Sequence, residues 1–119
     1  MAEQTKIGVI GGGKMGGALI GGMISRGLFP AASLTVADTD ERRLEELAAS
    51  CGVNVTTDNK AALRGARAVI LSVKPQNMAE VLSGLAGAAE PATLFISIAA
   101  GIATTFIEER LGKGVRVIR

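Results

Sequence analysis

The stretch IGVIGGGKMGGAL, residues 7–19, constrains the fold of this chain more than any other segment. It sets an apolar run typical of a buried strand directly against a cluster of glycines, and it then continues with the apolar spacing of a helix. Gly11, Gly13 and Gly16 spell G-x-G-x-x-G at this junction. A strand that turns into a helix through this spacing is typical of a chain that wraps the pyrophosphate of a dinucleotide.

The glycines of this motif have three different predicted tasks. We expect Gly11 to allow the tight turn, Gly13 to let the backbone approach a pyrophosphate closely, and Gly16 to let the helix pack against the strand. The N-terminus of the helix then presents unpaired N–H groups and a partial positive charge to the anion. The alternative is a tight turn below a glycine-rich helix without a ligand, which gives no reason for glycine at position 13.

The predicted helix contains further glycines at positions 17, 21 and 22. Glycine inside a helix costs about 1 kcal/mol relative to alanine, so these positions need a compensating reason. We expect Gly17, Gly21 and Gly22 to allow close packing against a neighbouring helix.

Segments with strand and helix periodicity alternate along the whole chain. The pattern predicts strands at 6–10, 34–37, 53–56, 69–73, 94–98 and 115–118, and helices at 14–27, 40–50, 59–63, 76–85 and 104–111. This alternation predicts an α/β fold of the Rossmann type, a doubly wound parallel sheet formed by one domain over residues 1–119. A central apolar strand seldom ends a domain, so we expect the chain to be the first part of a longer protein.

The composition excludes several classes of function. The single cysteine, Cys51, and the absence of histidine leave no internal disulfide, no metal site and no Ser-His or Cys-His nucleophile. The net charge of +2, the scattered basic residues and the scarcity of aromatic side chains argue against nucleic acid as a partner. No apolar run reaches the roughly 20 residues of a membrane span, and no signal peptide is recognisable. We therefore expect a cytoplasmic protein without a membrane partner.

Asp38 ends the second predicted strand, at the place where an acidic side chain can bind the adenosine ribose hydroxyls of NAD. It can also cap the following helix, as can Thr39 or Asp40. Thr39, Arg42 and Arg43 are placed to hold the 2′-phosphate of NADP, although a neighbouring carboxylate would repel that group. The residues alone leave NAD and NADP as open alternatives.

Two later segments lie at the carboxyl ends of predicted strands, where a doubly wound sheet binds its ligand. They are LSVKPQ at 71–76 and SIAAGI at 97–102. Together with IGVIGGGKMGGALIGGM and the terminal VRVIR, they make the chain resemble the N-terminal domain of the pyrroline-5-carboxylate reductases over essentially all 119 residues. The V-K-P-Q and A-A-G pair is far more specific than the glycines, which the more distant β-hydroxyacid dehydrogenases share.

The resemblance implies a cofactor site built from several parts of the chain. The segment that wraps the pyrophosphate corresponds to Ile10, Gly11, Gly12, Gly13, Lys14 and Met15. The adenosine side corresponds to Asp38 and Asn59, with Thr39 as a further candidate beside them. The strand ends that line the cofactor towards its nicotinamide correspond to Ser72, Val73, Lys74, Pro75, Ile98, Ala99 and Ala100. Aspartate at position 38 departs from the small polar residue often found in the family, so the expected cofactor is NADP or NAD.

Some of these positions also have ordinary structural explanations. Asn59 can be a helix cap, Lys74 a solvated charge, and the segment from Ala99 to Gly101 a tight turn. These alternatives need no ligand.

In this family the whole protein uses NAD(P)H to reduce the ring C=N bond of 1-pyrroline-5-carboxylate to proline. A helical C-terminal domain forms dimers, from which larger homo-oligomers are built, and supplies much of the substrate pocket. This chain stops before that domain, so the resemblance implies only the cofactor-binding part and identifies no catalytic residue in it. The alternatives are another imine or β-hydroxyacid reductase, and a non-catalytic dinucleotide-sensing module.

Overall fold

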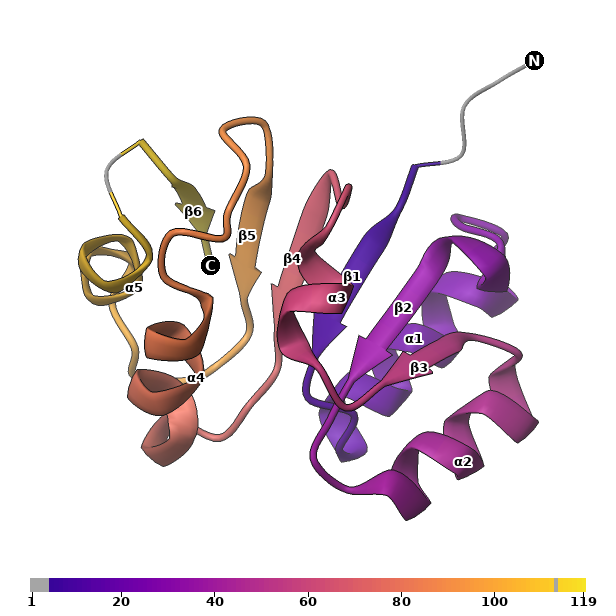
Figure 1. The fold of residues 1–119 in the computed structure, drawn as a ribbon. Coiled ribbons are helices and arrows are strands. Elements are labelled where there is room, and N and C mark those ends of the chain that lie inside the picture. The colour runs from indigo at the N-terminus through magenta and orange to yellow at the C-terminus, as the bar shows by residue number, and fades with distance from the viewer. Residues whose placement is uncertain (1–4, 113) are drawn as a thin grey trace.

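Within residues 5–112 and 114–119, which this computed structural model describes, six short parallel strands form one sheet between two layers of helices (Figure 1). The strands are β1 (Ile7–Ile10), β2 (Leu34–Ala37), β3 (Asn54–Thr56), β4 (Ala68–Leu71), β5 (Leu94–Ser97) and β6 (Arg116–Ile118). The helices are α1 (Lys14–Ser25), α2 (Glu41–Cys51), α3 (Asn59–Leu63), α4 (Met78–Leu85) and α5 (Thr104–Leu111). Two 3₁₀ turns, η1 (Ala31–Ser33) and η2 (Pro75–Asn77), precede β2 and α4.

The order of the strands across the sheet is β3-β2-β1-β4-β5-β6, and every neighbouring pair is parallel. Ile7 of β1 is the register partner of Leu34 in β2 and of Ala68 in β4. The chain therefore runs outwards from β1 to β3, crosses back to β4 and runs outwards again to β6. This is the strand order of the Rossmann fold, so the predicted fold class is confirmed. In such a sheet, ligands bind where the order reverses, at the carboxyl ends of the strands.

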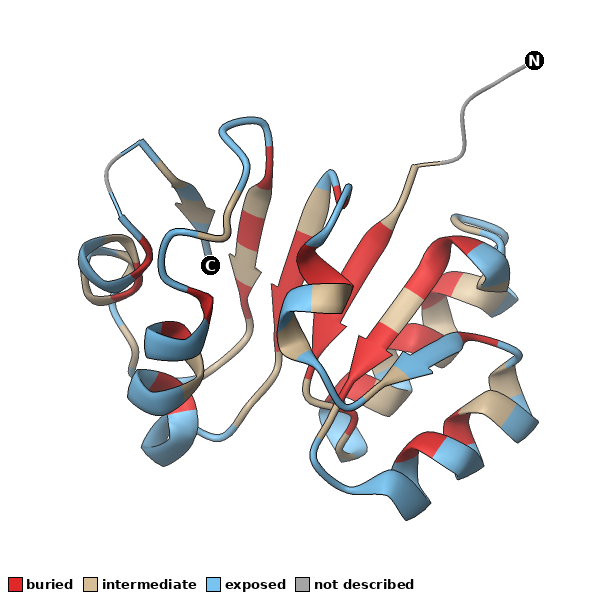
Figure 2. Ribbon diagram, viewed as in Figure 1, coloured by how far each residue is buried: buried red, intermediate tan, exposed pale blue. Residues whose placement is uncertain are grey.

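The sheet buries apolar side chains on both of its faces, because helices cover both faces (Figure 2). One core lies between the sheet and α3, α4 and α5, and the other lies between the sheet and α1 and α2. Val69 and Leu71 of β4 belong to the first core, and Ile70 between them belongs to the second. This alternation follows from the period of two residues in a strand. It explains why the strand is continuously apolar in sequence.

Several boundaries near the carboxyl edge of the sheet differ from the prediction by one or two residues, and the largest differences are at the end of β4 and the start of α4. β4 ends at Leu71, and Ser72 still bonds through its N–H and its hydroxyl to carbonyl oxygens at the end of β1. The helix predicted from residue 76 is α-helical only from Met78, since Pro75 opens the 3₁₀ turn η2. Both differences lie where the chain turns away from a strand, and neither changes the topology.

Gly16 lets α1 lie directly against the end of β1, as predicted. A Cβ atom at Gly16 would collide with the carbonyl oxygen of Gly11 and would lie 2.8 Å from the Ser72 hydroxyl oxygen. Real Cβ atoms do not approach backbone this closely, so only glycine permits this arrangement. The position of α1 relative to the sheet therefore depends on the absence of one side chain.

The later glycines of α1 do not have the predicted packing role. A Cβ at Gly17 would make an ordinary contact with Leu47 of α2 at 3.7 Å. A Cβ at Gly21 or Gly22 would meet no atom of the described chain within 4 Å. The expectation that Gly21 and Gly22 allow close helix packing is therefore wrong within this part of the protein.

This contrast predicts stability changes of opposite sign for alanine substitutions at Gly16 and Gly22. Gly16→Ala should lower the free energy of unfolding by about 1–3 kcal/mol, the usual cost of forcing extra volume into a packed site. Gly22→Ala should raise it by up to about 1 kcal/mol, because alanine is the better helix former and has room here. Urea denaturation of the two variants beside the wild type checks both signs. A Gly16→Ala protein as stable as Gly22→Ala would contradict the close approach of α1 to β1.

Candidate dinucleotide site

A cavity of about 1040 Å³ lies at the carboxyl ends of the central strands. Its volume is at the upper end of the roughly 300–1,000 Å³ range of small-molecule sites. All of the predicted site residues except one line it: Ile10, Gly11, Gly13, Lys14, Met15, Asp38, Thr39, Asn59, Ser72, Val73, Lys74, Pro75, Ile98, Ala99 and Ala100. The structure thus brings together residues from five separate parts of the sequence. Their roles as cofactor ligands remain predictions.

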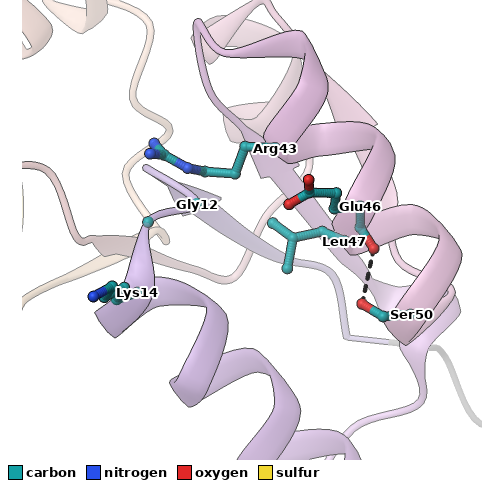
Figure 3. A pocket seen from close by; sticks show the side chains of 7 residues that line it. Gly12, Lys14, Arg43, Glu46, Leu47 and Ser50 are labelled. Atoms are coloured by element: carbon teal, nitrogen blue, oxygen red, sulfur yellow. Dashed lines mark hydrogen bonds between the residues drawn. The ribbon is translucent and has the colours of Figure 1, made fainter.

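The exception is Gly12, which is buried and faces α2 instead. It lines a second, smaller hollow of about 300 Å³ between α1 and α2, together with Leu47 and Ser50 (Figure 3). A Cβ at Gly12 would approach Leu47 to 2.9 Å, so this glycine permits the packing of the turn against α2. Gly12 therefore lets the glycine turn pack against α2 and does not line the main cavity.

Gly11 and Gly13 meet different requirements in the turn between β1 and α1. Gly11 has a φ of +99°, which favours glycine, and its N–H donates to the carbonyl oxygen of Ala37 at 2.8 Å. Gly13 has an ordinary φ of −68°, and a Cβ there would have only an Arg43 guanidinium nitrogen nearby, at 4.0 Å. Neither backbone conformation nor packing within the described residues therefore requires glycine at position 13. The space beside Gly13 opens into the cavity.

The N-terminus of α1 is well suited to an anion. Its N-cap, Gly13, offers no side chain to the first N–H groups, and its first turn contains no acidic residue. The first four N–H groups of a helix have no partners within the helix, so they point outwards. These groups and the helix dipole attract negative charge. The open space beside Gly13 and these donors fit the pyrophosphate of a dinucleotide.

Asp38 connects the end of β2 to the glycine turn and to α2. Its Oδ2 atom accepts a hydrogen bond from the N–H of Gly12 at 2.7 Å and contacts a guanidinium nitrogen of Arg43 at 3.2 Å. Its Oδ1 atom accepts from the N–H of Asp40 at 2.9 Å. Asp40, not Asp38 or Thr39, is the N-cap of α2, where its side chain accepts from the N–H of Arg43.

These contacts determine the charge state of Asp38. Burial alone would raise the pKa of its carboxyl, because a charge is less stable away from water. The two backbone N–H groups and the Arg43 guanidinium outweigh burial, so the pKa of Asp38 lies below its ordinary value of 3.8. Asp38 is therefore an ionised group at neutral pH.

Ser72 links β4 to the glycine turn. Its hydroxyl donates to the carbonyl oxygen of Gly11, and the carbonyl oxygen of Ile10 lies 3.1 Å away. Its N–H also donates to the carbonyl oxygen of Ile10, at 2.9 Å. The hydroxyl hydrogen is thus already used, and Ser72 can offer a ligand only its oxygen lone pairs.

Asn59 is not the helix cap that its position allows. The N-cap of α3 is Asp58, whose side chain accepts from the N–H of Lys60. Asn59 is only partly buried and lines the cavity. Its amide is therefore available to a ligand on the side of the cavity next to β2 and β3.

One wall of the cavity was missed from the sequence. It is formed by Asn77, Glu80, Val81 and Gly84, and Ala37 and Arg43 add to the lining near β2. Glu80, Val81 and Gly84 lie on one face of α4, since they recur at helical spacing, and Asn77 is the N-cap of that helix. The opposite face carries the buried Met78, which marks the core side. This helical spacing in the sequence could have indicated that these residues share one face and form a wall.

Two further kinds of site can be assessed in residues 5–112 and 114–119. Among them, no group of three or more acidic or Cys side chains is arranged to hold a metal ion. No helix formed by these residues is long and apolar enough to cross a membrane.

The strand order, the glycine turn between β1 and α1 and the cavity at the carboxyl edge define a Rossmann-type dinucleotide-binding domain. Residues 6–101 match the model of the family described as NADP oxidoreductase, coenzyme F420-dependent. The chain belongs to this family.

Curated relatives and solved structures give a consistent comparison. The chain is 42% identical over 117 residues to the pyrroline-5-carboxylate reductase of Methanosarcina acetivorans, which is 98% of this chain and 43% of that protein. It is 39% identical to the Pseudomonas aeruginosa enzyme of the same name, over 98% of this chain and 42% of the relative. A pyrroline-5-carboxylate reductase from Coxiella burnetii superposes with a TM-score of 0.86 at 32% identity, over 97% of this chain and 43% of that one. The chain thus spans less than half the length of these relatives.

A pyrroline carboxylate reductase of Plasmodium falciparum, solved with NADP bound, superposes with a TM-score of 0.82 over 98% of this chain and 42% of that one. Its sequence identity is 23%, so this likeness shows the fold alone.

The lowered pKa of Asp38 predicts a pH-dependent contribution to stability. Because the folded pKa lies below 3.8, the contribution is complete above pH 3.8 and is lost as the pH falls through the lower folded value. Asp38→Asn should therefore lower the free energy of unfolding at neutral pH and flatten its decline in this acidic range. Denaturant titrations at a series of pH values check this. Wild-type and variant curves that stay parallel down to about pH 2 would contradict the stabilised carboxylate.

Proposed function

We propose that the chain binds NADPH or NADH in the cavity at the carboxyl edge of the sheet. Gly13 is the observation that carries this proposal, because packing among the described residues gives no reason for glycine there. A side chain at position 13 would fill the space in front of the N-terminus of α1. The pyrophosphate would occupy that space, where the unpaired N–H groups and the helix dipole stabilise its charge.

The remaining lining residues support a position for each end of the cofactor. The adenosine would lie between the segment after β2, which carries Thr39, and the wall formed by α4, with Asn59 beside it. The nicotinamide would lie towards the ends of β4 and β5, near Lys74 and Ala99. When bound, the cofactor supplies the hydride, and the residues of this chain bind and orient it.

We further propose that the whole protein is a cytoplasmic oxidoreductase that reduces the C=N bond of 1-pyrroline-5-carboxylate to give proline. The support is the name shared by relatives that are 37–42% identical over 98% of this chain. These relatives are more than twice as long as the matched segment. The substrate itself therefore rests on the relatives and not on a pocket built by this chain.

We also propose that a further domain completes the substrate site and joins two copies of the protein. Ile96 of β5 and Ile118 of β6 are register partners, so they face the same side of the sheet. Ile96 is only partly buried and Ile118 is 49% exposed in the described chain. An apolar surface over two strands supports a covering element there. No residue of this chain is proposed as the proton donor.

Gly13→Val tests the cofactor site. The substitution should leave a folded domain, because the added side chain meets almost no protein atom. Affinity for NADPH should fall at least tenfold, about 1.4 kcal/mol, because valine occupies the space of the pyrophosphate. Isothermal titration calorimetry of the variant, the wild type and the control Gly22→Ala measures this. Unchanged affinity in Gly13→Val would exclude the proposed position of the pyrophosphate.

A turnover measurement tests whether this domain binds the cofactor without catalysing the reaction by itself. The 119 residues alone should bind dinucleotide but should not oxidise NADPH in the presence of 1-pyrroline-5-carboxylate, because nothing holds the imine carbon near the hydride donor. The same residues expressed with the coding sequence that follows Arg119 should catalyse the reaction. Cofactor absorbance at 340 nm follows both. Comparable rates for the two proteins would show that this domain already contains the complete active site.

A further inference from the structure

The outer faces of α1 and α2 differ, although both helices cover the same face of the sheet. All charged residues of α2 are exposed, namely Glu41, Arg42, Arg43, Glu45 and Glu46. α1 contains a single charged residue, Lys14 at its start, and the rest of the helix is apolar, glycine or serine. A helix that is apolar on all sides is ordinarily buried. The composition of α1 is therefore that of a helix whose outer face is covered as well.

The glycines of α1 distinguish two sides of this helix. A Cβ at Gly17 would contact Leu47 of α2 at 3.7 Å, so this side of the helix faces α2. Met15, Leu19 and Gly22, at intervals of four and three residues, lie on the side away from α2. Met15 is 65% exposed, Leu19 is partly buried, and a Cβ at Gly22 would meet no atom of the described chain within 4 Å. This second side of α1 is apolar and open in the part of the chain that the structure describes.

The half of the sheet formed by β5 and β6 is uncovered on the face where α1 lies. Ile96 of β5 and Ile118 of β6 are register partners, and Ile118 is 49% exposed. Ile96 is partly buried and packs against the same core cluster as Leu19, whereas Phe95 faces the core on the other side of the sheet and is fully buried. Figure 2 shows this alternation along β5. The core between the sheet and α1 is thus closed by α2 on one side and open over β5 and β6 on the other.

The handedness of the connections explains why this half of the sheet is bare. α1 and α2 connect strands that step outwards from β1 to β3, and α4 and α5 connect strands that step outwards in the opposite direction, from β4 to β6. Right-handed crossovers place these two pairs of helices on opposite faces of the sheet. A further crossover helix and strand added beyond β6 in the same way would put its helix on the α4 and α5 face again. The bare half can therefore be covered only by an element that departs from this alternation.

From these observations we propose that Met15, Leu19, Gly22, Ile96 and Ile118 form a docking surface for one helix from the part of the protein outside these 119 residues. An apolar helix lying beside α1, opposite α2, would complete the helix layer over the sheet. Gly22 would let this helix approach α1 closely, within the distance of about 8–10 Å that separates the axes of packed helices. The relatives that are 42% and 39% identical have more than half of their length outside the match, which is ample for such a helix.

This inference rests on the further domain proposed above and adds where that domain docks. Met15 belongs to the docking surface and also lines the main cavity, as does Ile98 at the end of β5. A helix on the surface would therefore border the end of the cavity assigned to the nicotinamide. The docked helix would close the site as well as the core.

Thiol labelling tests whether this surface is covered in the longer protein. In a Cys51→Ala background, Ile118→Cys places a thiol on the docking surface, and Val55→Cys places one on the edge strand β3 as a matched control. The two replaced side chains are 49% and 37% exposed, and cysteine is smaller than either, so neither variant obstructs docking. The rate of reaction with N-ethylmaleimide is compared between the 119-residue chain and the same chain extended by the coding sequence that follows Arg119.

A covered thiol reacts only when the structure opens locally, so Ile118→Cys should react at least about tenfold more slowly in the longer protein. Val55→Cys should change by less than about threefold, because no helix docks over it. Equal rates for Ile118→Cys in the two proteins would overturn the docking surface. Slow labelling in the 119-residue chain that becomes faster on dilution would identify a second copy of this domain as the occupant, and it would also overturn the proposal.

Gly22→Ala tests the close approach of the docked helix to α1. In the 119-residue chain the substitution should raise the midpoint of thermal unfolding, because alanine is the better helix former and has room there. In the longer protein the same methyl group should lower the midpoint, because it pushes the docked helix away. Gly17→Ala is the matched control, since its side faces α2, and it should shift the midpoint in the same direction in both proteins. A rise for Gly22→Ala in both proteins would contradict close packing at this position.

Turnover of the longer protein separates this inference from the proposed function on which it rests. Reduction of 1-pyrroline-5-carboxylate by a longer protein in which Ile118→Cys stays fully reactive contradicts only the docking surface. A longer protein without this turnover, in which Ile118→Cys is protected, contradicts the proposed substrate and supports the docking surface. Circular dichroism of every variant confirms that folded proteins are compared.

Discussion

The contact between α1 and the carboxyl end of β1 is the constraint on which the rest of this structure depends. Gly16 lies against the carbonyl of Gly11, and the Ser72 hydroxyl bonds to the same carbonyl from β4. A side chain at position 16 would push these three backbone segments apart. Their close approach fixes the N-terminus of α1 beside the point where the strand order reverses. The unpaired N–H groups of the helix consequently face the cavity and not the solvent at large.

A second set of contacts holds the glycine turn on the side that faces α2. Asp38 joins the glycine turn to the start of α2 through the N–H of Gly12 and the guanidinium of Arg43. A carboxylate that is 9% exposed would be costly without partners, but these donors compensate for its lost hydration. The turn is thus held between β4 and α2 before any ligand arrives. Such preorganisation lowers the entropic cost of binding, since little must be ordered on contact.

The fold and the grouping of the candidate site residues around one cavity could be predicted from the sequence because both follow from local patterns. Apolar periodicity identified the strands and helices, and the parallel topology then brought the glycine turn together with the segments that end β4 and β5. Contacts between distant side chains could not be predicted in this way. The Gly12 N–H donates a hydrogen bond to Asp38, and Asp58 instead of Asn59 caps α3. Both contacts depend on side-chain orientation. Several side chains can cap the same helix start, and the sequence does not rank them.

The wrong prediction for the helix glycines and the unpredicted α4 wall have physical reasons as well. Glycine in a helix suggests close packing, yet Gly21 and Gly22 face space that no described residue fills, so composition alone cannot distinguish contact from exposure. Val81 and Gly84 of the α4 wall were not predicted as site residues because their side chains carry no chemistry that marks a ligand. They matter only because one face of the helix is turned towards the cavity.

A crystal structure of the chain with NADPH tests the central claim most directly. We expect the pyrophosphate against Gly13, with its oxygens about 2.7–3.2 Å from N–H groups in the first turn of α1, the hydrogen-bond range for these atoms. The adenosine should lie between the segment after β2 and the wall of α4. A dinucleotide bound outside this cavity, or a pyrophosphate held away from the N-terminus of α1, would contradict the assignment of the site.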